Sequence, residues 1–356
     1  MAGYEIQHDF NAYLIALGLI FLLSILVAKE SARAEAWSVA VYTAQAGLIV
    51  GLVVILLSGW AKRESPSPGG LSYWGRDGVV EVAEGGDVYI DGLWHTRLSD
   101  GRSHIGSSFT WLMAVSAVLA HRDVPLRKAL VVGNGIGLTA STLAKVEGIH
   151  VVAYEINHTL ARLLADAPKE TLGVASNPRI EIRWQDARSG LALDESRYDL
   201  IVSAPLYLRQ AGSSLLLSRE YMELIKSRLN EGGVFTVYAG QRDPLKSLLV
   251  HRTVRSVFPH VQLLHGGQIA VASRKPIEIT EQSIQRRLGY EDPFYREVAR
   301  YDSAIRRDDR SLFDELRPRP FDSQPGVRVI TDDHPLVEYR NVIARLITPS
   351  DAADTP

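Results

Sequence analysis

An apolar strand that runs directly into a glycine-rich turn constrains the fold more than any other feature. Residues 128–132 read KALVV, and the chain continues as GNGIG through Gly133, Gly135 and Gly137 into a helical stretch that reaches Lys145. Glycines here permit a tight turn and let a ligand approach backbone amides closely. The pattern predicts a βα unit with its ligand at the carboxyl end of the strand.

Four further segments repeat the strand pattern. The second strand, HVVAYE, ends at Glu155, the third, RIEIRWQDA, ends at Asp186, and YDLIVSAP and GGVFTVYAG follow. Strands that alternate with helices predict a Rossmann-like, methyltransferase-type parallel α/β sheet. An acid at the tip of the second strand can accept both hydroxyls of a ribose. The candidate cofactor-binding residues are therefore Gly133, Gly135, Gly137, Glu155 and Asp186; the alternative is that both acids are helix caps or loop residues.

Several classes of ligand are disfavoured. Leu138 stands where the dinucleotide motif GxGxxG needs its last glycine, which disfavours NAD and favours an adenosyl-sulfonium ligand. The chain has no cysteine, which excludes zinc–thiolate sites and cysteine nucleophiles, and its formal net charge of -2 gives no reason to expect nucleic acid. The run Asp332, Asp333, His334 lacks metal-ligand spacing, so we predict no metal site and expect this run to cap a strand or tether the C-terminal segment.

Two uncharged apolar stretches, residues 11–28 and 36–60, are close to the ~20 residues that cross a bilayer. They predict a transmembrane hairpin over residues 1–63, with the lipid bilayer as its partner; a pair of buried helices is the alternative. Gly47 and Gly51 form a GxxxG motif that packs the two helices or contacts another membrane subunit. We expect the inner (cytoplasmic) membrane of a bacterium, with the main domain in the cytoplasm, where nucleoside donors are found.

The remaining chain divides by composition and pattern. We expect helices in the charged residues 279–319, as a solvated pair covering the sheet or as a docking surface, and a last strand at VRVIT. The predicted boundaries are a linker at 64–72, a small antiparallel β unit at 73–100, the Rossmann-like domain at 101–275, a C-terminal extension at 276–345 and a disordered tail at 346–356.

From about Tyr73 to Gly240 the chain resembles the spermidine synthase (aminopropyltransferase) family. The resemblance rests on VYIDGLWHTRLSD, VVGNGIG, YEIN, QDAR and YDLIVSAP, and TDDHPLVEY near the C-terminus resembles the tail of the membrane-bound bacterial branch. In that family, decarboxylated S-adenosylmethionine donates an aminopropyl group to putrescine. The resemblance implies that Glu155 holds the ribose and Asp186 contacts the adenine.

The chain departs from the family where amines are handled. Ile136 replaces the Asp that holds the donor's propylamine, and Ala204 replaces the Asp that serves as base. A Tyr-His-Glu run of the family aligns with Phe109, Thr110 and Trp111. We therefore assign no catalytic residue. Substitutes that lie near in sequence, but that spacing does not single out, are Tyr207, Tyr238, Gln241, His104, Asp100 and Asp243.

Two functions remain. The first is a membrane-anchored accessory or scaffolding subunit without aminopropyltransferase activity, which associates with other membrane subunits or as a homo-oligomer. The second is an active transferase that uses S-adenosylmethionine or its decarboxylated form on a polyamine or other small acceptor. Either protein could hold S-adenosylmethionine, its decarboxylated form or methylthioadenosine. The missing carboxylates favour the first function, because a dicationic acceptor needs them.

Overall fold

The structure is a computed structural model that describes residues 70–98, 109–121, 125–204, 212–240, 244–320 and 328–338. The chain divides into two compact units, Met1–Pro68 and Gly69–Pro356, and the described residues all belong to the second. Both predicted membrane spans, most of the predicted linker and the predicted disordered tail lie outside the described residues.

Within the described part of the chain, no helix is long and apolar enough to cross a membrane. The longest described helix, α8 (Pro244–Val257), has 14 residues. At a rise of about 1.5 Å per residue it is shorter than the roughly 30 Å hydrocarbon core of a bilayer. The prediction of an inner-membrane location is contradicted by this finding and is corrected here.

The predicted small β unit is confirmed as a four-stranded antiparallel sheet in which each strand pairs with the next. Turn residues with positive φ separate the strands, and the Asp91 carboxylate also accepts a hydrogen bond from the Val79 amide at 2.9 Å. One apolar cluster joins the sheet to the core through the buried side chains of Val80, Val82 and Val88. The strands are β1 (Leu71–Gly75), β2 (Gly78–Val82), β3 (Asp87–Ile90) and β4 (Leu93–Arg97).

The second sheet confirms the predicted α/β core, but it is mixed rather than wholly parallel. Its order is β10-β11-β9-β8-β5-β6-β7, with parallel pairing from β9 to β7 and antiparallel pairing of β11 with β9 and β10. The antiparallel strands at one edge were not predicted. The strands are β5 (Lys128–Val132), β6 (His150–Glu155), β7 (Ile180–Trp184), β8 (Tyr198–Ser203), β9 (Leu229–Tyr238), β10 (His260–Leu264) and β11 (Ile269–Ser273).

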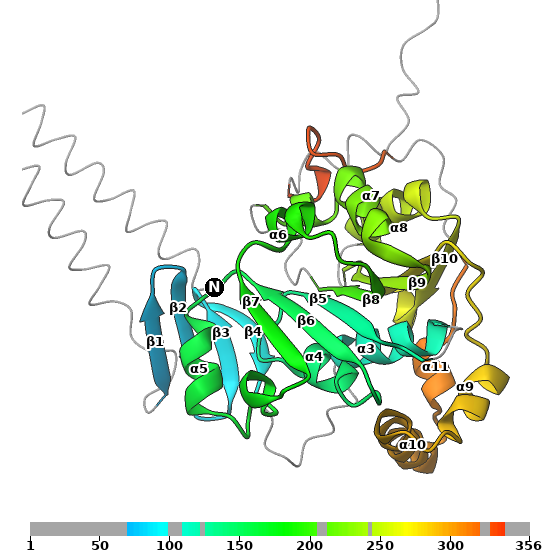
Figure 1. The fold of residues 1–356 in the computed structure, drawn as a ribbon, viewed down its shortest axis with the longest axis horizontal. Coiled ribbons are helices and arrows are strands. Elements are labelled where there is room, and N and C mark those ends of the chain that lie inside the picture. The colour runs from blue at the N-terminus through cyan, green and yellow to red at the C-terminus, as the bar shows by residue number, and fades with distance from the viewer. Residues whose placement is uncertain are drawn as a thin grey trace, which may run out of the picture. The chain divides into compact units, whose positions relative to one another are not determined.

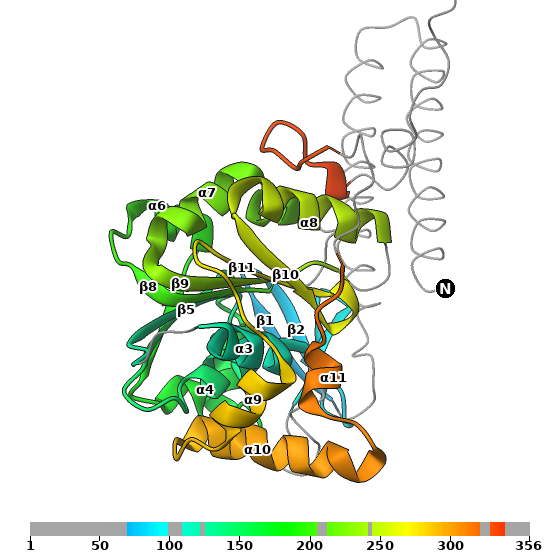
Figure 2. The same cartoon turned by 90° about the vertical axis from the view of Figure 1, so that its right-hand side faces the viewer.

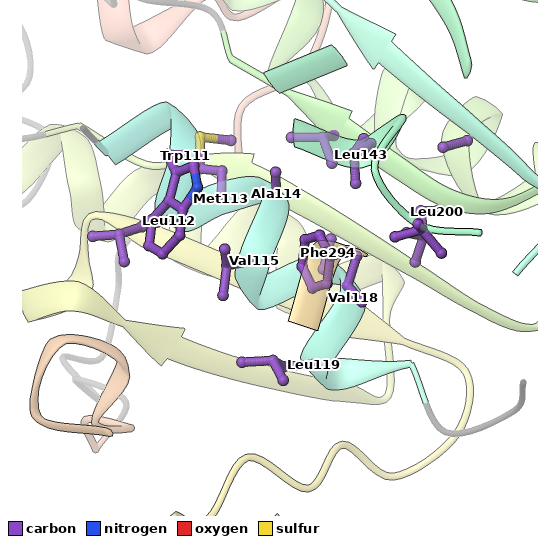
Figure 3. Packing of buried hydrophobic residues seen from close by; sticks show 14 of the residues in the cluster. Trp111, Leu112, Met113, Ala114, Val115, Val118, Leu119, Leu143, Leu200 and Phe294 are labelled. Carbon is purple, nitrogen blue, oxygen red and sulfur yellow. The ribbon is translucent and has the colours of Figure 1, made fainter. Parts of the chain in front are cut away.

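Helices cover both faces of this sheet (Figures 1 and 2). On one face α6, α7 and α8 share an apolar cluster with the strands, and on the other α3, α4, α9, α10 and α11 share a second cluster. Helix α3 is buried at every residue from Trp111 to Ala120, as its almost wholly apolar sequence requires (Figure 3), and the hydroxyl of buried Ser116 donates to the Met113 carbonyl at 2.9 Å. In addition to α8, the α-helices of the described residues are α3 (Phe109–Ala120), α4 (Leu138–Leu143), α5 (Leu160–Asp166), α6 (Ala187–Leu193), α7 (Arg219–Arg228), α9 (Glu281–Leu288), α10 (Pro293–Ile305) and α11 (Leu312–Leu316).

The C-terminal helices are held against the core by polar contacts as well as by apolar ones. Buried Arg287 of α9 donates to the Val118 carbonyl at 2.8 Å and to the His121 carbonyl. These acceptors lie at the C-terminal end of α3, where carbonyl groups lack partners within the helix. The predicted charged helices are therefore present, and α9 supplies a cap for α3.

The predicted strand at VRVIT is wrong for its described residues, which form no strand. The Ile330 amide donates to the Thr253 hydroxyl at 2.9 Å, and the Ile330 carbonyl accepts from the Arg219 amide at 2.8 Å. Both partners belong to helices α7 and α8. The backbone is thus satisfied by helix side chains and helix ends, and it needs no neighbouring strand.

Candidate functional site

The sheet order reverses at β5, which lies between β6 and β8. Loops after adjacent parallel strands diverge at such a point and leave a crevice for a ligand outside the carboxyl ends of the strands. The Gly133 amide donates to the Tyr154 carbonyl at 3.0 Å, and the Ala204 amide donates to the Val132 carbonyl at 3.2 Å. The glycine turn, Glu155 at the end of β6 and Ala204 after β8 therefore meet at one edge of the sheet.

The turn needs its glycines for different reasons. All three have positive φ, a region that residues with a Cβ rarely adopt. A Cβ at Gly137 would lie 2.5 Å from the Val174 side chain, so this glycine permits close packing. A Cβ at Gly135 would meet nothing within 4 Å, so that side of the turn is open. The open side is where a ligand can approach.

The Glu155 carboxylate braces the turn. One oxygen accepts the Gly135 amide at 2.8 Å and the other accepts the Asn157 amide at 2.9 Å. The side chain is only 7% exposed, and burial raises the pKa of Glu155 although these backbone amides oppose the shift. A carboxylate offers about four acceptor sites, so a group of this type can brace a turn and also accept a hydroxyl from a ligand.

Two features beside Glu155 were missed by the sequence reasoning. Ile156, the next residue, is 63% exposed, which leaves a large apolar side chain in solvent at the ligand edge of the sheet. Asn134 is buried, and its Oδ1 has no hydrogen-bond partner among the described residues. An exposed apolar group and an unpaired buried acceptor within the same turn region suit the flat ring and amino groups of a nucleobase. The signal that could have found Ile156 is its place directly after Glu155, at the end of β6.

Asp186 is found at the predicted edge, after β7, but with a structural task. Its Oδ1 accepts the Ser189 amide at 2.7 Å, which makes Asp186 the N-cap of α6. The helix-cap alternative therefore describes Asp186 correctly. A capping carboxylate retains a second oxygen, so the predicted contact with adenine stays a prediction.

Ile136 does not project into the open side of the turn. It is 6% exposed and belongs to the apolar cluster that contains Val80, Val82 and Val88 of the small sheet and Leu160 and Leu163 of α5. The turn residue that the family resemblance assigns to the donor's amine is thus part of the core between the small sheet and α5. A carboxylate there would be desolvated without a partner.

Three of the four positions that the resemblance assigns to the acceptor side, Ala204, Phe109 and Trp111, are also hydrophobic. Ala204 is partly buried against the core, and the Phe109 ring lies 4.8 Å from the Tyr238 ring between centroids. Trp111 is buried, and its indole nitrogen faces Glu297 of α10 at 3.4 Å. The Thr110 carbonyl accepts from the Thr139 hydroxyl at 3.4 Å. None of these aligned positions supplies a carboxylate.

Only some of the remaining candidate residues from the sequence lie in the described part of the chain. Tyr238 is buried and packs against Phe109. No metal-binding group of His, Cys, Asp and Glu occurs among the residues that the structure describes. The Asp332 carboxylate accepts from Arg188 at 2.7 Å, which confirms that this run tethers the C-terminal segment. The candidates outside the described residues are Tyr207, Gln241, His104, Asp100 and Asp243.

Comparison with known proteins finds two groups that are similar to this chain. The methyltransferase small domain family matches residues 113–269. Polyamine aminopropyltransferase 2 of Pseudomonas aeruginosa is 33% identical over 183 residues, which cover 49% of this chain and 50% of the relative. The polyamine aminopropyltransferase of Aeropyrum pernix is 26% identical over 200 residues, covering 53% and 62%.

The chain is a homologue of the spermidine synthases. A crystal structure of a probable spermidine synthase from Corynebacterium glutamicum shares the fold, with a TM-score of 0.50 and 19% identity over 64% of this chain and 89% of that one. The alignments with the first two relatives span only 50% and 62% of their lengths. This spermidine synthase homologue therefore shares its fold with these proteins, and it spans about half to two thirds of the length of the relatives that it matches.

The group that such folds use is S-adenosylmethionine or its decarboxylated form, and the residues fit it unequally. Glu155, the open Gly135 turn and exposed Ile156 suit the ribose and base. Ile136 and Ala204 offer no acceptor for an ammonium group. Among the described residues, the acceptors at this edge of the sheet therefore suit a nucleoside, and the side chains of Ile136 and Ala204 add none for an ammonium group.

Proposed function

We propose that this spermidine synthase homologue binds an adenosine-type nucleoside and lacks aminopropyltransferase activity, so that it acts through binding. The observation that supports the proposal most strongly is the burial of Ile136 in an apolar cluster. At that position a carboxylate would have to pair with the donor's ammonium group. A protein that acts through binding alone needs an intact fold, but it needs no residue that transfers a proton.

The nucleoside part of the proposal rests on Glu155. Its carboxylate is fixed by the amides of Gly135 and Asn157, so little reorganisation is needed when ribose hydroxyls donate to it. Hydrogen bonds to an ionised acceptor contribute about 1.5–3 kcal/mol each. This is enough to favour a nucleoside over a free base.

The loss of transfer activity rests on the acceptor side. An ammonium group attacks carbon only after it loses a proton, and this step needs a base within hydrogen-bond reach. The described residues after β8 and at the start of α3 supply Ala204 and Phe109 in this region. Neither side chain can accept a proton, and neither carries the negative charge that would neutralise an ammonium group.

Calorimetric titration with methylthioadenosine and with decarboxylated S-adenosylmethionine tests both parts. The two ligands share the nucleoside and differ in the aminopropyl group. We expect micromolar binding of both with affinities within about threefold, because no carboxylate pairs with the amine. A paired ammonium would add about 1.5–3 kcal/mol, or roughly 10- to 100-fold in affinity. Such a preference for the amine ligand would contradict the proposed loss of transfer activity.

A matched pair of variants locates the binding site. Glu155→Gln should weaken binding of methylthioadenosine about tenfold or more, because one carboxylate hydrogen bond is lost. Glu181→Gln makes the same change near the amino end of β7, where the carboxylate pairs with Arg183, and should leave binding unchanged. If neither nucleoside binds to folded wild-type protein, the nucleoside part of the proposal is wrong.

An active transferase with another acceptor is the second candidate. The retained Glu155 carboxylate, held ready by two backbone amides, favours it. Such an enzyme would act on a less cationic acceptor, since neither Ala204 nor the aromatic pair of Phe109 and Tyr238 supplies a carboxylate. Release of methylthioadenosine or S-adenosylhomocysteine in the presence of a neutral acceptor would support it over the first candidate.

A further inference from the structure

The described C-terminal residues 328–338, here called the strap, contact the three helices α6, α7 and α8. The Ile330 backbone bonds to Arg219 of α7 and Thr253 of α8, and the buried Lys246 ammonium of α8 donates to the Val337 carbonyl. Ile330, Leu336 and Val337 are buried in the cluster formed by α6, α7 and α8. The strap is therefore an integral part of this face of the fold.

One ion pair connects the strap to the helix that Asp186 caps. The Arg188 guanidinium binds both oxygens of the Asp332 carboxylate, with Nη1 at 2.7 Å from Oδ1. Bidentate pairs of this kind fix the orientation of both groups. Arg188 lies two residues after Asp186, in the first turn of α6. The strap thus holds the end of α6 that faces the candidate nucleoside site.

The same guanidinium also contacts the next described segment after Ala204, which begins at Gly212. Arg188 Nη1 donates to the carbonyl of Leu215, in the short 3-10 helix η3 (Ser213–Leu216), at 2.8 Å and to the Ser218 hydroxyl at 3.3 Å. The Ser218 hydroxyl is the N-cap of α7, because it accepts the Tyr221 amide at 3.2 Å. One side chain therefore ties together the strap, α6, η3 and the start of α7.

The network continues to the strand that ends at the site. The hydroxyl of buried Tyr221 lies 3.4 Å from the hydroxyl of Ser203, the last residue of β8. Ala204 follows directly. Tyr221 thus joins two separate contacts through its own covalent frame: its amide bonds to Ser218, which Arg188 contacts, and its hydroxyl lies beside Ser203 at the edge of the sheet.

We propose that Asp332 is a positioning residue: through Arg188 it holds α6 and η3 in the arrangement that binds the nucleoside, so the strap sets nucleoside affinity without touching the ligand. This inference rests on the proposed nucleoside binding. The Arg188 and Asp332 side chains are 25% and 35% exposed, so solvent screening lowers the strength of the pair, and geometry matters more than charge.

The test compares two neighbouring substitutions that remove the same charge from the same segment. Asp332→Asn loses the pair with Arg188, whereas Asp333 is exposed and Asp333→Asn serves as the matched control. By calorimetry, Asp332→Asn should weaken binding of methylthioadenosine about fivefold, and Asp333→Asn should change it by less than about twofold. Amide hydrogen exchange without ligand should become faster in residues 187–193 and 212–218 of Asp332→Asn only.

The outcomes separate this inference from the function on which it rests. Wild-type protein that binds methylthioadenosine, together with unchanged affinity in Asp332→Asn, overturns the positioning role alone. Faster exchange in β5 and α3 as well as in α6 also overturns it, because the effect is then global unfolding. Absence of binding by the wild type overturns the proposed function and, with it, the assignment of Asp332 to that site.

Discussion

Replacing Ile136 by Asp would restore the family's carboxylate at the turn, and the structure predicts that it destabilises the fold instead of restoring donor binding. The Ile136 side chain is 6% exposed among buried valines and leucines of the small sheet and α5. Loss of such a side chain costs about 2–5 kcal/mol, and a buried carboxyl without a partner adds about 1–3 kcal/mol. Together these losses amount to about 3–8 kcal/mol, a large fraction of the roughly 5–15 kcal/mol that stabilises a typical domain.

Urea unfolding of the full chain measures this effect. Ile136→Val is the control, because it keeps the apolar character and should cost only about 1 kcal/mol. The destabilisation by Ile136→Asp should also decrease at acidic pH, since burial raises the pKa of the introduced carboxyl and its neutral form is better tolerated. An Ile136→Asp variant with wild-type stability and tighter binding of decarboxylated S-adenosylmethionine would refute the account, because Ile136 would then face the donor.

Three further predictions follow from single contacts. Gly137→Ala should lower the free energy of unfolding by about 2 kcal/mol or more, since its Cβ would lie 2.5 Å from Val174 at positive φ; thermal unfolding measures this. Arg287→Ala should cost about 2–4 kcal/mol in urea unfolding because it uncaps α3, whereas exposed Arg286→Ala should change stability by under about 0.5 kcal/mol. Calorimetry should show that affinity for methylthioadenosine falls as the pH drops through the raised pKa of Glu155, because the carboxylate accepts hydroxyl groups better than the neutral acid. The free energy of unfolding should show the reverse dependence: burial favours the neutral acid, so stability falls as the pH rises through that pKa.

The local pattern of apolar residues and turns in the sequence was sufficient to predict the core of the fold. The strands that end at Val132, Glu155 and Ser203 are apolar runs closed by glycine, acidic or proline-containing turns, so their limits could be read within a few residues. The edge strands β10 and β11 were missed because HVQLL and IAVAS are short and lack alternation. VRVIT has the composition of a strand but is paired with helices, which only tertiary structure decides.

The candidate site was predicted in position but not in detail. Motif spacing brought the glycine turn and Glu155 to one edge of the sheet, since carboxyl ends of parallel strands meet there. The inward direction of Ile136 depends on the small sheet about 50 residues earlier in the chain, and residue type alone does not encode it. The Arg188–Asp332 pair joins residues 144 positions apart, so no local pattern reveals it.

Release of methylthioadenosine is the most direct test of the central claim that this homologue does not transfer aminopropyl groups. The purified full chain is incubated with decarboxylated S-adenosylmethionine and putrescine, and methylthioadenosine is quantified by chromatography. The account predicts no release above that of a heat-denatured control. Putrescine-dependent release that disappears in Glu155→Gln and persists in Glu181→Gln would contradict it, because the site would then carry out the reaction without the carboxylates that Ile136 and Ala204 replace.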